Sequence, residues 1–430
     1  MDTVKHMKAS ELKSKINDGA LTKYSRLYES VDVQRGRFSQ LIDTFISLYG
    51  DREAELLSVP GRSEISGNHT DHNRGCVLAG AINRDVIAVA ARNDDGVIRI
   101  YSEGYEREEI LLQDCSNPDN FDKYTSKSLI AGTVGGFELR GYKVGGFDIA
   151  LTSDVLKGSG ISSSAAFEVM IGNALNHLYN EGAIPNTEIA KVAQYAENAY
   201  FGKPCGLMDQ MACAVGGFVY IDFADASSPE VTPIDFSLDD AGYALCIVNT
   251  GGNHADLNED YASVPREMKL VAKELSRDVL CGVSEEELIL NVPTLRQSVG
   301  DRAILRALHF IRENKRVVKA KTALLNGELD KFFEAVNDSG SSSFKYLQNV
   351  YTTENVSEQG LSLALALAEG YLGGEGASRV HGGGFAGTIQ IFVRKTRLDG
   401  IVSLMDSVFG KGSAMAFNVR PVGAALLDLD

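Results

Sequence analysis

A glycine- and serine-rich turn between a strand-like and a helix-like segment constrains this chain more than any other stretch. Residues 155–166 read VLKGSGISSSAA, after an alternating apolar run at 147–151 and before apolar residues at helical spacing over 167–178. We therefore predict a strand, a turn and the start of a helix. The first N–H groups of such a helix have no partner within it and lie at the positive end of its dipole, so they can bind an anion such as phosphate.

The candidates for binding a nucleotide phosphate are the glycines and serines of this turn: Gly158, Ser159, Gly160, Ser162, Ser163 and Ser164. Their hydroxyls can also bind a metal ion. The turn does not end in Gly-Lys-Ser or Gly-Lys-Thr, which excludes a Walker A loop, and its glycine spacing is not that of a dinucleotide-binding fingerprint. A phosphate loop of another kind and a plain helix cap both remain open at this point.

The bulk composition limits the class of partner. With 430 residues, 44% hydrophobic and 23% charged, the chain is long enough for two or three globular domains. Its formal charge of -16 argues against a nucleic acid or an anionic membrane as partner. A small anionic substrate needs only a local positive pocket, so we expect a small-molecule partner.

Cysteine usage and hydropathy indicate the compartment. The six cysteines form no Cys-x-x-Cys pair, which is typical of free thiols in a reducing environment. Residues 1–28 lack the apolar core of a signal peptide, and no apolar run approaches the length of a membrane span. We expect a cytoplasmic protein that does not enter a membrane.

The order of strand-like and helix-like segments predicts an α+β protein of two domains. We place the N-terminal domain at 1–224, with a helical leader over 1–40 packed on its outside, and the C-terminal domain at 225–430. The polar stretch 225–230 is the expected boundary. The segment 57–75 is polar and interrupted by glycines, so we expect it outside the core.

Individual elements follow from the apolar periodicity. Strands are expected at 77–91, 97–101, 108–112, 217–223, 244–249, 389–393 and 415–422, and helices at 38–49, 124–139, 186–201, 259–275, 305–325, 329–347, 354–369 and 398–409. The helix at 124–139 is weakened by three glycines. The strands of the second half indicate an antiparallel sheet.

Four separated motifs occur in an order that points to one family. They are Pro-Gly-Arg at 60–62 followed by His-Thr-Asp at 69–71, the turn at 158–166, Gly-Leu-Met-Asp-Gln at 206–210, and the glycine cluster at 379–388. Together they resemble the galactokinase branch of the GHMP small-molecule kinases, over roughly residues 38–428. The resemblance implies a two-domain α+β kinase with a mixed N-terminal sheet, an antiparallel C-terminal sheet, and the active site in the cleft between them. It also implies ATP-dependent phosphorylation of a galactose-type sugar at its anomeric hydroxyl, by a monomer or weak homodimer.

The same resemblance implies roles for individual residues. Asp209 corresponds to the catalytic carboxylate and Arg62 to the arginine beside it, and Ser164 and Glu197 correspond to the ligands of Mg²⁺. Sugar contacts are implied for Asn68, His69, Asp71, Gly206 and Tyr261. Phosphoryl transfer needs these parts, because it depends on positioning, on neutralising oxygen charge and on an acceptor for the hydroxyl proton.

The chain departs from the motifs at several positions. Asn68 stands where the family has the glutamate that contacts the far end of the sugar, and His381 and Thr388 replace a threonine and a cysteine in the late glycine turn. Glu64, Ser66, His72 and Ala386 are further departures. The loss of the carboxylate at position 68 suggests a substrate such as galacturonate, whose C6 carboxylate that glutamate would repel.

Two other functions remain open. A kinase-like sensor that binds ATP and sugar and regulates transcription is possible, although such sensors can lack part of the Ser-Ala segment that is present here at 164–165. A GHMP kinase acting on mevalonate or homoserine is disfavoured by the His-Thr-Asp and Met-Asp-Gln segments.

Overall fold

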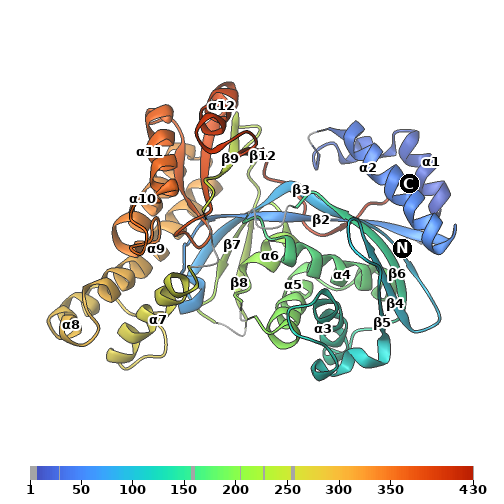
Figure 1. Ribbon diagram of the computed structural model, residues 1–430, viewed down its shortest axis with the longest axis horizontal. Helices are drawn as coiled ribbons and strands as arrows, with labels where there is room; N and C mark the ends of the chain where they lie inside the picture. Colours follow the sequence, from blue (N-terminus) through green and yellow to red (C-terminus); the bar gives the residue numbers. More distant parts are fainter. Residues whose placement is uncertain are drawn as a thin grey trace.

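Two β-sheets, bridged by the long strands β2 (Glu53–Ser66) and β3 (Cys76–Arg92), organise the computed structural model of the protein (Figure 1). The structure describes residues 7–28, 30–155, 160–203, 205–225, 228–252 and 257–429. Within these residues, no helix combines the length and the apolar character that a membrane crossing requires.

The first sheet is mixed, as predicted. Its path is β1-β2-β3-β6-β4-β5, with β13 added to β2, β7 to β3 and β8 to β7. The pair β4–β6 is parallel, and the other described pairs are antiparallel. Besides β2 and β3, its strands are β1 (Met7–Lys8), β4 (Val97–Ser102), β5 (Glu108–Leu111), β6 (Phe147–Ser153), β7 (Phe218–Asp222), β8 (Glu230–Ile234) and β13 (Ala425–Leu426).

Four helices pack together on one face of this sheet (Figure 1): α3 (Ser126–Leu139), α4 (Ser163–Asn180), α5 (Asn186–Tyr195) and α6 (Met208–Val215). A π-helical turn, Ala196–Phe201, extends α5. The glycines of α3 strengthen this packing, because a Cβ at Gly132 would lie 2.8 Å from Ala196 Cα and one at Gly136 would lie 2.8 Å from Val192 Cγ1. The helix predicted at 124–139 therefore forms through close contact with its neighbours, in spite of its low intrinsic propensity.

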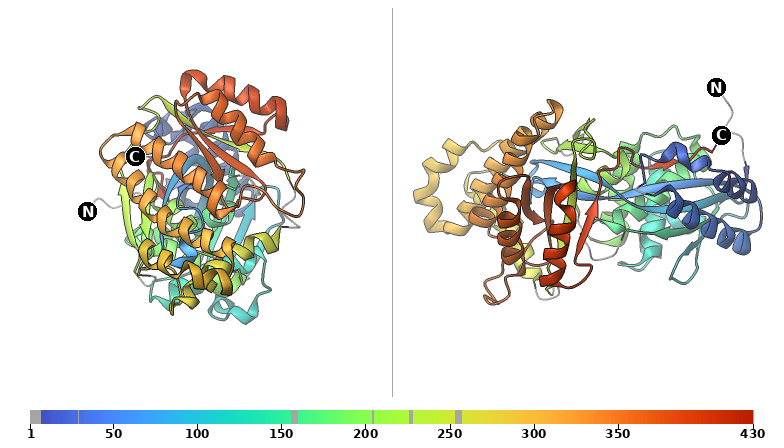
Figure 2. Two further views of the ribbon diagram at one scale, coloured as in Figure 1. Left: turned by 90° about the vertical axis from the view of Figure 1, so that its left-hand side faces the viewer. Right: turned by 90° about the horizontal axis from the view of Figure 1, so that it is seen from above.

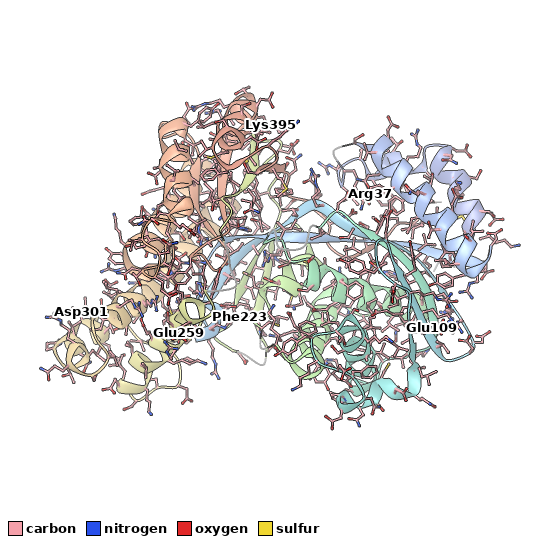
Figure 3. The ribbon with its side chains drawn as sticks, in the orientation of Figure 1. Arg37, Glu109, Phe223, Glu259, Asp301 and Lys395 are labelled. Carbon is pink, nitrogen blue, oxygen red and sulfur yellow. The ribbon has the colours of Figure 1, made fainter. Side chains whose placement is uncertain are left out.

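The leader covers the opposite face of the first sheet. Helices α1 (Ala9–Asn17) and α2 (Val31–Tyr49) bury an apolar cluster of their own against β2, β3 and β6. Arg37 of α2, labelled in Figure 3, pairs with Asp85 of β3 at 2.8 Å and with Asp154, just before the phosphate loop, at 3.0 Å. The last residues of the chain lie beside the leader (Figure 2), where Tyr24 donates a hydrogen bond to the carbonyl of Asp428 at 2.8 Å.

The second sheet is antiparallel throughout, in the order β10-β11-β9-β12. Its strands are β9 (Tyr243–Asn249), β10 (Ala377–His381), β11 (Thr388–Arg394) and β12 (Ala414–Phe417). The helices of this half are α7 (Asn258–Glu274), α8 (Glu285–Ser298), α9 (Asp301–Leu325), α10 (Leu329–Ser342), α11 (Gly360–Leu372) and α12 (Leu398–Phe409). Helices α11 and α12 belong to the apolar cluster of this sheet, whereas α7, α8 and α9 form a separate one.

The structure divides the chain differently from the expected boundary at residue 225. Strand β8 at 230–234 pairs with β7, so the polar stretch at 225–230 belongs to a connection within the first sheet. The chain also returns to this sheet at its end, where β13 pairs with β2 and Val419 bridges Ile82. The two sheets therefore separate in the chain between β8 and β9.

The expectation that residues 57–75 lie outside the core was wrong. Strand β2 runs without interruption through residue 66, and Ser63, Arg62 and Glu64 on it are all buried. Their polar groups find partners in other parts of the chain, which allows charged residues to occupy a central strand.

Candidate active site

A bulge in β2 brings that strand against the phosphate loop. The pairing of β2 with β3 shifts register between Pro60 and Arg62, which places Gly61 in the irregular position. A Cβ on Gly61 would lie 2.7 Å from the carbonyl oxygen of Ile161, and the N–H of Arg62 donates to that same oxygen at 3.1 Å. The Pro-Gly-Arg sequence therefore docks β2 on the loop, because only glycine allows the backbones to come this close.

Arg62 and Asp209 meet beside the loop, as the resemblance implied. Arg62 Nε donates to Asp209 Oδ1 at 2.8 Å, and Arg62 Nη1 donates to the carbonyl of Gly160 at 2.7 Å. The hydroxyl of Ser162 donates to the other oxygen, Asp209 Oδ2, at 2.6 Å. Strand β2, the phosphate loop and α6, which are far apart in the sequence, thus meet at the carboxylate of Asp209.

The environment of Asp209 keeps this carboxylate ionised. Burial by itself raises the pKa of Asp209, but the charge and hydrogen bond of Arg62 and the hydrogen bond from Ser162 outweigh it and lower the pKa below its ordinary value. The side chain is still 34% exposed. A substrate hydroxyl can therefore reach an ionised proton acceptor.

The phosphate loop leads into α4, which begins at Ser163. Ser162, at the N-cap position, has a left-handed backbone with φ of 61°, and its hydroxyl binds Asp209 instead of capping the helix. Ser163 is half-buried and Ser164 is exposed, in the first turn where free N–H groups favour an anion. Gly158 and Ser159 lie outside the described residues.

Glu197, one of the two metal ligands implied by the resemblance, lies buried in the turn Ala196–Phe201. Its Oε1 lies 3.1 Å from Nζ of Lys203, and its Oε2 accepts a hydrogen bond from Gln210 at 2.8 Å. The same Gln210 nitrogen donates to Glu168, whose pKa is raised well above its ordinary value by burial and by the charge of Glu197. Among the described residues, no contact joins Glu197 to Ser164.

The segment after β2 meets the late glycine turn of the second half. His69 Nε2–H donates to the carbonyl of Gly383 at 2.9 Å, and burial lowers the pKa of His69 to about 4, so the imidazole is neutral. The hydroxyl of Tyr261, on α7, donates to the carbonyl of Gly384 at 2.7 Å. Asn68 also donates to this turn, at the carbonyl of Gly382. Three of the expected sugar-contacting residues, Asn68, His69 and Tyr261, are thus hydrogen-bonded to the turn.

Asp71 and Gly206 also come together. The Asp71 carboxylate accepts the N–H of His72 at 2.9 Å, and a Cβ at position 206 would lie 2.3 Å from Asp71 Oδ2. Position 206 must therefore be glycine if Asp71 is to keep its place.

Asn68 does not leave the site without a carboxylate, contrary to the premise of the acid-sugar hypothesis. Its side chain is fully buried, and its Nδ2 donates to Glu64 Oε1 at 2.9 Å and to the carbonyl of Gly382 at 2.7 Å. Glu64 in turn pairs with Arg379 at 3.1 Å. The carboxylate missing at position 68 is present at position 64 in the same hydrogen-bonded group.

Sequence reasoning missed Glu64, Arg379 and Gln210 as parts of the site. Glu64 was recognisable as a departure from the family motif, but its bond to Asn68 was not. Arg379 is distant in the chain and carried no signal of its own.

Comparisons with known proteins agree with this arrangement. Residues 128–217 match the GHMP kinases N terminal domain, and residues 43–92 match the galactokinase galactose-binding signature. A galactokinase from Glaesserella parasuis serovar 5 is 30% identical over 364 residues, which cover 84% of this chain and 91% of that protein. One from Streptomyces coelicolor is 29% identical over 377 residues, covering 87% and 93%.

Solved structures of small-molecule kinases are also similar to this chain. The crystal structure of Lactococcus lactis galactokinase complexed with galactose has a TM-score of 0.76 at 25% identity, covering 90% of this chain and 99% of that one. A mevalonate kinase structure has a TM-score of 0.59 at 15% identity, covering 86% and 99%, and shows the shared fold only.

The two-sheet α+β fold and the match over α3 to α6 define a small-molecule kinase of the GHMP class. Within that class, the match to the galactose-binding signature and the similarity over most of the chain both point to galactokinases in particular. The chain belongs to the galactokinase family, which confirms the prediction of a sugar kinase.

Proposed function

We propose that this protein is a galactokinase, which transfers the γ-phosphoryl group of ATP to the anomeric hydroxyl of galactose and forms galactose 1-phosphate and ADP. The observation that carries the proposal is the ion pair between Arg62 and Asp209 at 2.8 Å, placed beside the loop that opens α4. It combines a proton acceptor, a cation and a helix N-terminus at one point, and these are the parts that phosphoryl transfer needs.

Each group has a task in this reaction. Asp209, held ionised by Arg62, orients the sugar hydroxyl and accepts its proton. Arg62 is also placed to offset negative charge that develops on the transferred group, while the N–H groups at the start of α4 bind the ATP phosphates. The sugar is proposed to bind beside Asp71, next to Gly206, and His69, which is bonded to the glycine turn at 382–384.

Magnesium fits the residues proposed to hold it. Mg²⁺ prefers oxygen ligands, and Ser164 and Glu197 offer a hydroxyl and a carboxylate. The Glu197 carboxylate also attracts a cation in the present structure, since Nζ of Lys203 lies 3.1 Å away. When bound, the ion would neutralise charge on the phosphates of ATP.

The galacturonate and sensor hypotheses gain no support from the comparisons. The argument for an acidic sugar required the loss of a carboxylate, and Glu64 supplies one beside Asn68. Galactose is therefore the substrate that we propose.

A coupled assay of ADP release with galactose, galacturonate, N-acetylgalactosamine, arabinose and fucose tests the proposal. We expect turnover of galactose, and we expect Asp209→Asn to lower kcat by about 10² to 10⁴, the usual contribution of a general base. The matched control is Asp43→Asn, which changes an exposed carboxylate on α2 that pairs with Lys13 and should leave kcat unchanged. A wild-type enzyme inactive on galactose, or an unimpaired Asp209→Asn variant, would contradict the proposal.

A further inference from the structure

Two residues at the base of the late glycine turn form a cross-strand pair. His381 ends β10 and Thr388 begins β11, and they are directly opposite each other in the antiparallel register. His381 Nδ1 lies 2.9 Å from the hydroxyl of Thr388, and both side chains are buried. The residues between them form the turn whose carbonyls bind Asn68, His69 and Tyr261.

The other face of the imidazole reaches across to β2. His381 Nε2 lies 3.1 Å from the hydroxyl of Ser63, the residue next to Arg62. That hydroxyl also donates to Gln390 Oε1 at 3.4 Å, and Gln390 Nε2 donates to the carbonyl of Ile65 at 3.0 Å. Through β10 and β11, the second sheet therefore holds β2 at Ser63 and Ile65, just after Arg62.

The hydrogen-bond network assigns one tautomer to His381. If Ser63 donates to Gln390, then Nε2 must carry the proton and donate to Ser63, while Nδ1 accepts from Thr388. Burial and the neighbouring charges of Arg62 and Arg379 lower the pKa of His381 to about 3, so the ring is neutral. In this state the ring Nε2–H donates to Ser63, the Ser63 hydroxyl donates to Gln390, and the Thr388 hydroxyl donates to Nδ1.

The pair also lies close to the phosphate loop. A Cβ placed on Gly160 would lie 3.3 Å from the Thr388 hydroxyl and 3.4 Å from His381 Nδ1. The carbonyl of Gly160 is the second acceptor for Arg62, at 2.7 Å. His381 and Thr388 thus lie beside both the strand that carries Arg62 and the loop residue that binds its guanidinium.

We propose that His381, acting with Thr388, is a positioning residue for phosphoryl transfer, which fixes Arg62 by holding Ser63 on one side and Gly160 on the other. The two residues act as one unit, because removing either one leaves a buried polar atom of the other, His381 Nδ1 or the Thr388 hydroxyl, without its hydrogen-bond partner. The proposal deepens the proposed function, on which it rests.

A double-mutant cycle with a conservative rescue tests it. The variants are His381→Leu, Thr388→Val, the double variant His381→Leu/Thr388→Val, and His381→Gln, whose amide nitrogen can still donate to Ser63. We expect His381→Leu to lower kcat about ten- to one hundredfold, because a small displacement of a catalytic group has effects of this size. Thr388→Val should lose less, the double variant should be no worse than His381→Leu, and His381→Gln should recover most of the activity.

Two further measurements separate positioning from folding. The affinity for a non-hydrolysable ATP analogue, measured by calorimetry, should fall at least threefold in His381→Leu, because the variant disturbs Gly160. The matched control is His177→Leu, which removes another neutral histidine, at the end of α4, and should change neither kcat nor nucleotide affinity.

The outcomes are distinct. If His381→Leu, His381→Gln and Thr388→Val lower only the melting temperature and keep kcat and nucleotide affinity within twofold, the positioning role is refuted and the pair is structural. If His381→Leu does not fold, Thr388→Val decides the question: a kcat and a nucleotide affinity within twofold of wild type refute the positioning role, and a larger loss supports it. If the wild type does not phosphorylate galactose, the proposed function fails, while the affinity measurements still decide the role of His381.

Discussion

The buried hydrogen-bonded pair of Glu64 and Asn68 gives a sharp prediction for Asn68→Asp. In the native protein Asn68 Nδ2 donates to Glu64 and to the carbonyl of Gly382, and Oδ1 accepts from Asn349 at 2.7 Å. Asn68→Asp keeps the size of the side chain but replaces the donor nitrogen with an oxygen. Two donated hydrogen bonds are lost, and two carboxylates face each other in a buried site.

The cost can be bounded in two ways. Two carboxylates about 4 Å apart repel by about 4 kcal/mol at an effective dielectric constant of about 20. The variant can avoid this by protonating one carboxyl, which for an ordinary pKa of about 3.9 costs about 4 kcal/mol at pH 7 and about 1.5 kcal/mol at pH 5. We therefore expect Asn68→Asp to lower the free energy of unfolding by about 4 kcal/mol at pH 7.

The destabilisation should depend on pH with a definite sign. The folded variant holds a proton that the unfolded chain releases above about pH 4, so its stability relative to wild type falls as the pH rises from 5 to 7. Urea unfolding followed by circular dichroism measures this, since the chain has no tryptophan for fluorescence. The double variant Glu64→Gln/Asn68→Asp should recover most of the loss. Equal stability of Asn68→Asp and wild type at pH 7, or no rescue by Glu64→Gln, would refute the reasoning.

Three further predictions concern the active site. The lowered pKa of Asp209 should keep kcat flat from pH 5 to 8. Arg62→Gln should move the acid limb of the kcat–pH profile upward, because the pKa-lowering charge and hydrogen bond of Arg62 are lost while burial still raises the pKa of Asp209; an unmoved limb would argue against Asp209 as the titrating group. Gly206→Ala places a Cβ 2.3 Å from Asp71 Oδ2 and should raise the KM for galactose at least tenfold with a smaller effect on the KM for ATP, and equal changes in both would contradict a sugar-specific role. Glu197→Gln should weaken Mn²⁺ binding, measured by electron paramagnetic resonance of the ATP complex, at least tenfold, and unchanged binding would remove Glu197 from the metal site.

The sequence predicted the elements whose stability is local. The helix expected at 398–409 is α12, Leu398–Phe409, because its apolar residues repeat with the helical period. Helix α8 was not predicted, since Pro293 interrupts it and Leu290, 81% exposed, breaks the pattern of buried apolar positions. Strand β2 was misjudged because its charged residues are buried by partners far along the chain.

In the candidate site, too, the sequence predicted features that local motifs carry and missed contacts between distant residues. Ordered motifs located Arg62 and Asp209, and the structure brings them into contact. Pairings such as Glu64 with Arg379, or His381 with Ser63, join residues more than 300 positions apart and depend on how the second sheet docks on β2. Spacing in the sequence carries no information on such contacts, so the supporting network could be found only in the folded chain.

The return of the chain's end to the first sheet has a consequence for how the protein folds during synthesis. Arg420 is fully buried and forms an ion pair with Asp85 of β3 at 3.0 Å, and β13 follows it on β2. A nascent chain lacking these residues has a carboxylate with only part of its counter-charge and an incomplete strand pairing. The first sheet should therefore reach its final structure during synthesis only after residues 420–426 have emerged from the ribosome.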